Sequence, residues 1–434
     1  MNKTLPLYRW LGAGALTAMA TLLAACGGST TDPDAAGLRV LNASPDYASL
    51  DLYIDGAKEI GATASGDVSS GLSISAGTYT MALRNAGGTT TLTSASRTVG
   101  EETNYVLVAY GNSGALKSTL LAESEDAPSS GSAKLRVLLA AADAGSLDVY
   151  MSDSCATVTD FSDASAVVSS LAAGATSSFV TTGSGTLCLR VTGAGDTTDL
   201  RLAIPTLTLA SQEVSTLVLQ PGSGGVLLNG IRLRQGASTT AHANTLARVR
   251  LVAGVADNAT VAATVGTTTL SAGARSPAVG SYALVSAGSP ALSILVNGTA
   301  LASNALAATA GGDYTLLVTG SAAAPSLAVL SDDNRLAATS AAKLRAVHGA
   351  SALSGDSLTL TVDFAALADN IAFATASSYS SVATTSDRSV EVSAASAASA
   401  LYSNAELTLT SQGVYSIFVL SNGSGTTAVL RKDR

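Results

Sequence analysis

A short strand-like segment recurs four times along the chain, and this internal repetition limits the possible folds more than any other feature. The copies read Leu-Arg-Val-Leu at 38–41 and 135–138, Ala-Arg-Val-Arg at 247–250 and Leu-Arg-Ala-Val at 344–347. The arginines of these copies, Arg39, Arg136, Arg248 and Arg345, are spaced 97, 112 and 97 residues apart. Near-constant spacing of this size indicates tandem copies of one domain.

Each copy is followed by a segment in which apolar and polar residues alternate, as at 50–54 and 147–151. Period-two alternation is typical of a strand with one buried face. Each repeat closes with two apolar runs around a turn rich in Gly, Asn and Ser, which predicts a hairpin. We therefore predict an all-β chain of tandem immunoglobulin-like antiparallel β-sandwich domains, with a single long β-solenoid as the alternative.

The repeats also predict the domain boundaries. A length of 434 residues suits several domains of about 100 residues each. Segments between the repeats are rich in Ser, Ala, Gly and Thr, as expected of linkers. We expect four β-sandwiches, at 38–124, 134–234, 246–336 and 343–434.

The N-terminus carries the features of an export signal. Lys3 and Arg9 form a positive region without acids, and the apolar stretch 11–22 is too short to span a bilayer. The sequence Leu-Ala-Ala-Cys at 23–26 then resembles the lipobox of bacterial lipoproteins. We therefore predict a signal peptide at 1–25 and a lipid-modified Cys26, followed by a polar tether up to residue 37. Cleavage by an ordinary signal peptidase and an uncleaved anchor are the alternatives.

This resemblance implies a location in the cell envelope. Acyl chains such as palmitate on Cys26 would hold the protein at a membrane, because each buried CH₂ adds about 0.8 kcal/mol. The next residue is Gly27 rather than the aspartate that retains enterobacterial lipoproteins at the inner membrane. The expected location is therefore the outer membrane of a Gram-negative bacterium.

The net charge argues against nucleic-acid binding. The charge of −8 would become −10 after loss of Lys3 and Arg9, and no Lys/Arg cluster offsets it. A protein of this sign repels phosphate backbones. We expect no nucleic-acid partner.

The first repeat resembles a family of exported bacterial proteins described as a domain of unknown function. Its repeats open with R-V-x-H/N-A-S-P-D and continue into a D-V-Y-x-D-G strand. Here residues 39–46 read Arg-Val-Leu-Asn-Ala-Ser-Pro-Asp and residues 50–56 read Leu-Asp-Leu-Tyr-Ile-Asp-Gly. The second repeat keeps part of this pattern, whereas the third and fourth keep the arginine strand and lack Ser-Pro-Asp. The resemblance implies a sandwich at the cell envelope and assigns no functional residues.

Cys155 and Cys188 are the remaining cysteines, and both lie in the second repeat. An oxidising compartment favours a disulfide between them, and closing a loop of this size is worth about 3–4 kcal/mol. Two separate buried thiols are the alternative. Neither their spacing nor their neighbours suggest a metal site.

Catalytic chemistry has few candidate residues. A Ser/His/Asp site needs a histidine base, and the two histidines are His242, in a linker-like stretch, and His348, at the end of a first strand. We interpret the former as a solvated loop residue and the latter as a structural hydrogen-bonding group. Asp332-Asp333-Asn334 could bind calcium, and Asp160 with Asp163 could serve glycoside hydrolysis, but solvated loop acids are the simpler interpretation.

These observations predict a non-enzymatic envelope lipoprotein without cofactor, whose tandem domains have a spacer or interaction role toward an envelope protein or glycan. A surface glycan-binding protein is the alternative. Glycan readers use aromatic platforms, and Trp10 lies within the predicted signal peptide. Tyr47, Tyr53 and Tyr79 are then the candidates for such a platform.

Overall fold

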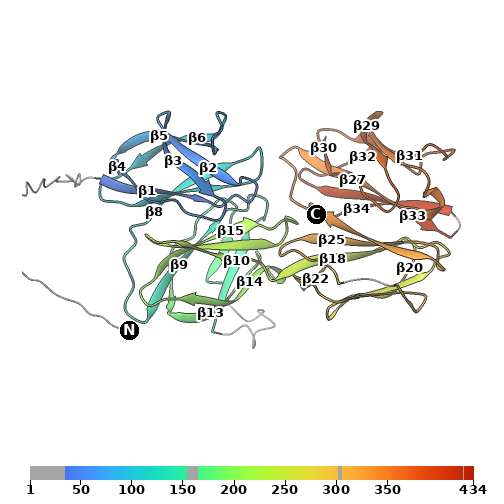
Figure 1. Cartoon of the computed structure of the whole chain (residues 1–434), viewed down its shortest axis with the longest axis horizontal. Helices are drawn as coiled ribbons and strands as arrows, with labels where there is room; N and C mark the ends of the chain where they lie inside the picture. Colours follow the sequence, from blue (N-terminus) through green and yellow to red (C-terminus); the bar gives the residue numbers. More distant parts are fainter. Residues whose placement is uncertain (1–34, 154–164, 302–304, 424) are drawn as a thin grey trace, which may run out of the picture.

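The computed structural model describes residues 35–153, 165–301, 305–423 and 425–434. Within these ranges the chain forms eight β-sheets, which pack in pairs as four β-sandwiches (Figure 1). The only helical element of this part of the chain is a short 3₁₀ turn, η1 (Ser351–Leu353). The predicted all-β fold of tandem β-sandwiches is therefore confirmed.

The four sandwiches share one topology. In the first, the sheet orders are β4-β1-β7-β8 and β3-β2-β5-β6. Its strands are β1 (Ala35–Asn42), β2 (Ser49–Ile54), β3 (Ala57–Ala64), β4 (Leu72–Ser75), β5 (Gly77–Asn85), β6 (Thr91–Val99), β7 (Tyr105–Tyr110) and β8 (Lys117–Ala122). Those of the second are β9 (Ser132–Leu139), β10 (Leu147–Ser152), β11 (Val168–Leu171), β12 (Val180–Gly183), β13 (Gly185–Gly193), β14 (Asp196–Leu209), β15 (Val214–Pro221), β16 (Leu228–Arg234) and β17 (Thr239–His242).

The third and fourth sandwiches repeat this order with small variations at the edges. The third has β18 (Leu246–Ala253), β19 (Thr260–Val265), β20 (Thr268–Arg275), β21 (Ala278–Val279), β22 (Ala283–Ser286), β23 (Leu292–Val296), β24 (Thr299–Leu301), β25 (Asp313–Gly320) and β26 (Pro325–Asp332). The fourth has β27 (Ala341–Gly349), β28 (Leu358–Val362), β29 (Ala365–Ile371), β30 (Ser380–Ala383), β31 (Arg388–Ala394), β32 (Tyr402–Leu407), β33 (Val414–Asn422) and β34 (Gly425–Lys432).

One strand pair in each sandwich is parallel. The first strand pairs in parallel with the strand that opens the closing hairpin: β1 with β7, β9 with β15, β18 with β25 and β27 with β33. Parallel strands are usually buried on both faces and read as continuous apolar runs. The run at 105–110, whose last five residues are all buried, fits this rule. The first sheet of each sandwich therefore needs cover on its outer face as well.

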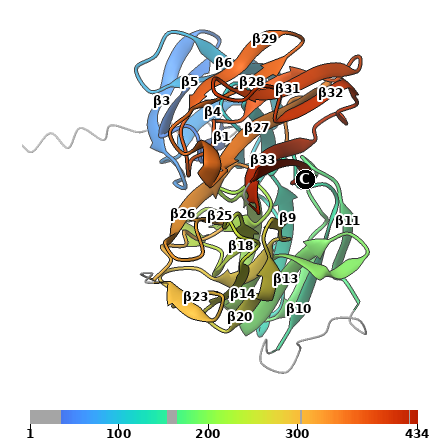
Figure 2. The same cartoon turned by 90° about the vertical axis from the view of Figure 1, so that its right-hand side faces the viewer.

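That cover comes from a neighbouring sandwich. The sheet containing β1 packs against the sheet containing β9, with Leu41 and Val108 of the first sandwich against Leu138 and Ile231 of the second in one buried cluster. The third and fourth sandwiches pair in the same way through their β18 and β27 sheets. Figures 1 and 2 show the result, a two-by-two block rather than an extended string.

The pairing register corrects the alignment of the repeats. Leu38 lies beside Tyr105, Val249 beside Tyr314 and Leu344 beside Tyr415. The arginine that follows Leu38, Val249 and Leu344 therefore occupies the same position in each repeat. In the third repeat this arginine is Arg250, and not Arg248 as the spacing had indicated. The error arose because both positions of the third repeat carry arginine.

The two pairs of sandwiches meet at a glycine-rich turn, residues 222–225 between β15 and β16. The Gly224 N–H donates to the Gly311 carbonyl at 2.9 Å, and the Asn334 N–H donates to the Gly224 carbonyl at 2.9 Å. A Cβ atom on Gly225, whose φ is +89°, would overlap the backbone nitrogen of Arg335. Glycine is needed here because two backbones approach each other closely.

Ion pairs surround this junction. Arg335, between the third and fourth sandwiches, lies 3.0 Å from Asp46 of the first. Arg434 lies 3.4 Å from Asp143 of the second. Asp46 is the acid of the Ser-Pro-Asp motif, and Asp143 stands at the equivalent place in the second repeat. All four sandwiches therefore contribute to one polar junction.

Candidate functional site

The cysteines named by the sequence are only partly within the described structure. Cys26 and Cys155 lie outside the described residues, so the lipid attachment and the disulfide remain predictions. Cys188 lies on β13 and is 1% exposed. Its burial makes it a poor site for reactions that need contact with solvent.

The aspartates of the family motif have structural roles. Asp51 on β2 accepts hydrogen bonds from the N–H groups of Ala62 and Gly87 and from Lys58. Burial raises its pKa, but these donors outweigh burial and hold the pKa of Asp51 below its usual range. Asp148 in the second sandwich likewise accepts from the N–H of Ser170. Both carboxylates satisfy backbone groups that an irregular strand pair leaves unpaired.

Neither histidine lies in a catalytic arrangement. His348 is fully buried in β27, and its Nε2 lies 3.2 Å from the Leu353 carbonyl. His242, predicted in a solvated loop, instead lies on β17 and is partly buried, because 239–242 pair with β16. Burial lowers the pKa of both rings.

The acids suggested for calcium are bound to cations or amides of the protein itself. Asp333 lies 3.0 Å from both Arg335 and Lys343. The Asn334 side chain donates to Asp313 at 2.7 Å. No group of three or more His, Cys, Asp or Glu side chains in the described ranges could hold a metal ion. Asp160 and Asp163 lie outside those ranges.

Asp332 belongs to a buried network between the third and fourth sandwiches. Arg345 of the fourth sandwich contacts Asp332 of the third at 2.5 Å, and Arg250 of the third contacts Asp433 of the fourth at 2.5 Å. Both arginines and both carboxylates are almost completely buried. The two sandwiches thus exchange ion pairs across their interface.

Hydroxyl groups complete the network in the same two-fold pattern. Asp332 accepts from Tyr282 and Thr315, each at 2.6 Å. Asp433 accepts from Tyr379 at 3.0 Å and from Ser416 at 2.5 Å. The groups around Asp332 and the groups around Asp433 are therefore chemically equivalent.

Burial and neighbouring charges keep the tyrosines and Arg250 of this network in the forms that bond their neighbours. Burial raises the pKa of Tyr282 and of Tyr379, so both phenols stay protonated and can donate. Burial lowers the pKa of Arg250, but Tyr282 and the carboxylates Asp433 and Asp332 outweigh it and raise the pKa overall. The network therefore holds the third and fourth sandwiches together.

Two cavities flank this network. One, of about 530 Å³, is lined by Arg345, Tyr379 and residues of β26. The other, of about 430 Å³, is lined by Arg250, Tyr282 and residues after and within β34. No pattern in the sequence analysis pointed to either cavity, because each is formed by two separate domains.

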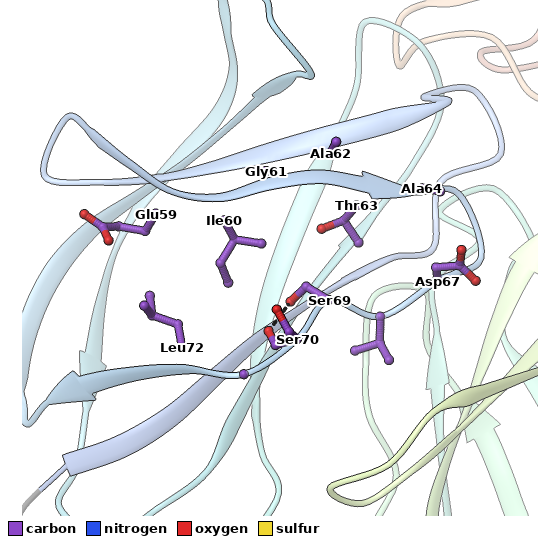
Figure 3. Close-up of a pocket in the computed structure, with 12 residues that line it drawn as sticks. Glu59, Ile60, Gly61, Ala62, Thr63, Ala64, Asp67, Ser69, Ser70 and Leu72 are labelled. Carbon is purple, nitrogen blue, oxygen red and sulfur yellow. Dashed lines mark hydrogen bonds between the residues drawn. The ribbon is translucent and has the colours of Figure 1, made fainter. Parts of the chain in front are cut away.

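A third cavity, of about 340 Å³, lies at the open edge of the first sandwich between β3 and β4 (Figure 3). Ile60 and Leu72 point into it from the two strands, while Glu59 and Asp67 lie toward its opposite ends. The Ser69 hydroxyl bonds the Ser70 carbonyl and accepts from the Val40 N–H. With its hydroxyl committed to the backbone and no histidine in the lining, Ser69 is not an activated nucleophile.

The tyrosines considered for a glycan platform do not share an exposed face. Tyr47 is 7% exposed and packs in the core of the first sandwich. Tyr79 packs against the same core and donates to the Ser75 carbonyl. The ring of Tyr53 is covered by Arg84, at 4.0 Å. The predicted platform is wrong for Tyr47, because an interior position takes this side chain away from any ligand.

Among the described residues, no helix is long and apolar enough to cross a membrane.

Comparisons with solved structures give only distant likenesses. The Bacillus anthracis TIE protein is 9% identical with a TM-score of 0.15, and the match covers 64% of this chain and 49% of that protein. The CBM26-family module of Eubacterium rectale Amy13K, in complex with maltoheptaose, is 12% identical with a TM-score of 0.15, covering 48% and 96%. The pneumococcal glycogen-degrading virulence factor SpuA is 6% identical with a TM-score of 0.17, covering 84% and 37%. This chain spans about half the length of the TIE protein, and scores this low establish no shared fold.

No curated relative matches the sequence. A family model described as a domain of unknown function, DUF4397, matches residues 36–150 and 247–355, which are more than half of the chain. The first stretch covers the first sandwich and reaches into β10 of the second, and the second stretch covers the third sandwich and β27 of the fourth. The third repeat is included although it lacks Ser-Pro-Asp. The chain therefore belongs to the DUF4397 family.

Proposed function

We propose that the protein is a cell-envelope lipoprotein, attached to a membrane through Cys26, whose four sandwiches form a rigid module with a non-enzymatic spacer or interaction role. The observation that carries the proposal is the paired packing of the sandwiches. Each pair shares an apolar interface cluster, and the second pair adds buried ion pairs between domains. A block of packed domains of this kind suits a spacer or a surface for binding a partner better than it suits a function that requires motion between domains.

The chemistry of the buried polar groups supports a non-enzymatic role. Asp51, Asp148, Asp332 and Asp433 each accept hydrogen bonds from neighbouring groups of the protein. His348 bonds a backbone carbonyl. Side chains committed in this way stabilise the fold and are not free to transfer protons to a substrate.

Membrane fractionation of the full chain tests the anchor. The wild-type protein should be found with membranes, and mass spectrometry should give an N-terminal peptide that begins at an acylated Cys26. Cys26→Ala should appear in the soluble fraction, whereas Ser29→Ala, three residues further on, should behave like the wild type. A wild-type N-terminus at any other residue would contradict the proposal.

A substrate screen tests the absence of catalysis. Esters, glycosides and peptides should show no turnover above a heat-denatured sample of the same protein. Turnover that the native protein shows and the denatured sample lacks would overturn the non-enzymatic role.

A location in an oxidising compartment can be tested through the two cysteines of the second repeat. We propose that Cys155 and Cys188 form a disulfide, whose loss should cost about 3–4 kcal/mol in the chain-entropy model. Alkylation of the denatured protein should label neither cysteine before reduction and both after it. Labelling of both without reduction would contradict the disulfide.

A further inference from the structure

The two cavities beside the buried ion-pair network are equivalent in position and different in charge. Asp332 follows Leu330 and Ser331 at the end of β26, and Asp433 follows Arg431 and Lys432 directly after the end of β34. Because the two aspartates make equivalent bonds, the residues just before them are also equivalent. The 530 Å³ cavity is therefore lined by Leu330 and Ser331 where the 430 Å³ cavity is lined by Arg431 and Lys432.

Arg431 and Lys432 bring an unbalanced positive charge. Both are exposed, and within the described structure neither side chain makes an ion pair or hydrogen bond. The other charged groups in the lining are already matched, since Arg248 pairs with Asp313 and Arg250 pairs with Asp433. The cavity thus has a surplus of two positive charges on a chain whose net charge is −8.

The Arg250 side chain in the lining is buried and held by its neighbours. It contacts Asp433 at 2.5 Å, and its Nη2 atom lies 3.9 Å from Asp332. Tyr282 lies beneath both Arg248 and Arg250, at 4.6 and 4.5 Å from its ring centre, which fixes these guanidinium groups in place.

We propose that this cavity, between the third and fourth sandwiches, binds an anionic sugar through its phosphate or carboxylate group. Arginine and lysine side chains recognise these oxyanions through charge-assisted hydrogen bonds. The cavity is larger than one oxyanion requires, and the hydroxyl of Ser281 in its lining suits a polar ligand. The site needs only the paired third and fourth sandwiches and is independent of the lipid anchor.

Calorimetric titration of the detergent-solubilised full chain tests the proposal. Glucose 6-phosphate and glucuronate carry the two kinds of oxyanion, and glucose is their neutral match. Both anionic sugars should bind and glucose should not, and binding should weaken as salt is added because exposed charges are screened. Binding of glucose as tight as that of the anionic sugars, or no binding of either anionic sugar, would overturn the proposal.

The residues of the 530 Å³ cavity are the basis for a variant of the basic cavity. Arg431→Leu with Lys432→Ser gives the basic cavity the residues of its neutral counterpart, and affinity for both anionic sugars should fall about tenfold or more. Arg275→Leu with Lys117→Ser removes the same charges from exposed positions on β20 and β8 and should leave affinity unchanged. Arg431→Gln, which keeps a polar side chain of similar length, should give an intermediate loss. Equal affinities of the first pair and the control pair would refute the site, and thermal unfolding of each variant checks that it is folded.

Discussion

Asn42 of the first sandwich and His348 of the fourth stand at the same position of the repeat and make the same bond. The Asn42 amide donates to the Tyr47 carbonyl at 2.9 Å, and His348 Nε2 lies 3.2 Å from the Leu353 carbonyl, in both cases five residues further on. A carbonyl can only accept, so Nε2 carries a proton. Either side chain can hold the loop after the first strand, so Asn and His have the same role at this position in the first and fourth sandwiches.

This bond predicts a pH dependence. Burial lowers the pKa of His348 below its ordinary value of 6.5. Below pH 6.5 the histidine of the unfolded chain takes up a proton, whereas the folded ring does so only when the pH reaches its lowered pKa. The contribution of His348 to stability is therefore fully present above pH 6.5 and is lost as the pH falls toward the lowered pKa. Urea unfolding at about pH 8 and about pH 5 should show a smaller acid loss in His348→Asn than in the wild type. His242 is present in both proteins, so an identical acid loss would exclude His348 as its source.

The exchanged ion pairs predict a strong coupling between Arg345 and Asp332. Arg345→Leu should destabilise the protein by about 3–5 kcal/mol, because Asp332 is then left buried without its cation. Adding Asp332→Asn should recover part of that loss. Denaturant unfolding of the two single variants and the double variant measures the coupling. Simple addition of the two single effects would mean that the residues do not interact.

The glycine-rich junction predicts different costs for two glycine substitutions. Gly225 and Gly114 have similar positive φ values, +89° and +78°, but a Cβ on Gly114 meets nothing within 4 Å. Gly114→Ala should cost about 1 kcal/mol from backbone strain alone. Gly225→Ala should cost more and should make the segment between the two pairs of sandwiches easier to cleave in limited proteolysis. Equal unfolding free energies for the two variants would show that the close approach to Arg335 is unimportant.

The turn between β28 and β29 predicts a stabilising substitution. Phe364 is 93% exposed with a φ of +66°, whereas the corresponding turn of the first sandwich has Asp55 followed by Gly56. A large side chain in this conformation is strained, and glycine is not. Phe364→Gly should raise the unfolding free energy by about 0.5–1 kcal/mol, measured by urea unfolding. The reverse change, Gly56→Phe, should lower it, and a gain in both variants would contradict the explanation.

The features that could be predicted from the sequence are those encoded locally. The repeats and their alternating strands follow from residue order within about 100 positions. The assignment of Arg248 failed because spacing alone cannot distinguish two arginines on the same strand. Val261 lies 11 residues after Arg250, as Leu50 lies 11 after Arg39. That equality was the signal for the correct register. The fourth repeat departs from it because η1 lengthens the loop before β28.

The pairing of the sandwiches and the buried network are not encoded in this local way. Arg250 and Asp433 are 183 residues apart, and no periodicity relates them. Alternation shows that a strand has a buried face and does not show what covers it. The continuous apolar run at 105–110 did indicate burial on both faces. It could not indicate that the second sandwich provides the cover.

The apolar outer faces of the β1, β9, β18 and β27 sheets restrict how proteins of this architecture can change in length. A chain that lost one sandwich by truncation would expose the apolar cluster of the interface to water, and in the second pair also one partner of each buried ion pair. Such a sheet would recruit another protein or aggregate. A duplication that added a single sandwich would have the same defect. Viable relatives with the same packing should therefore carry sandwiches in even numbers.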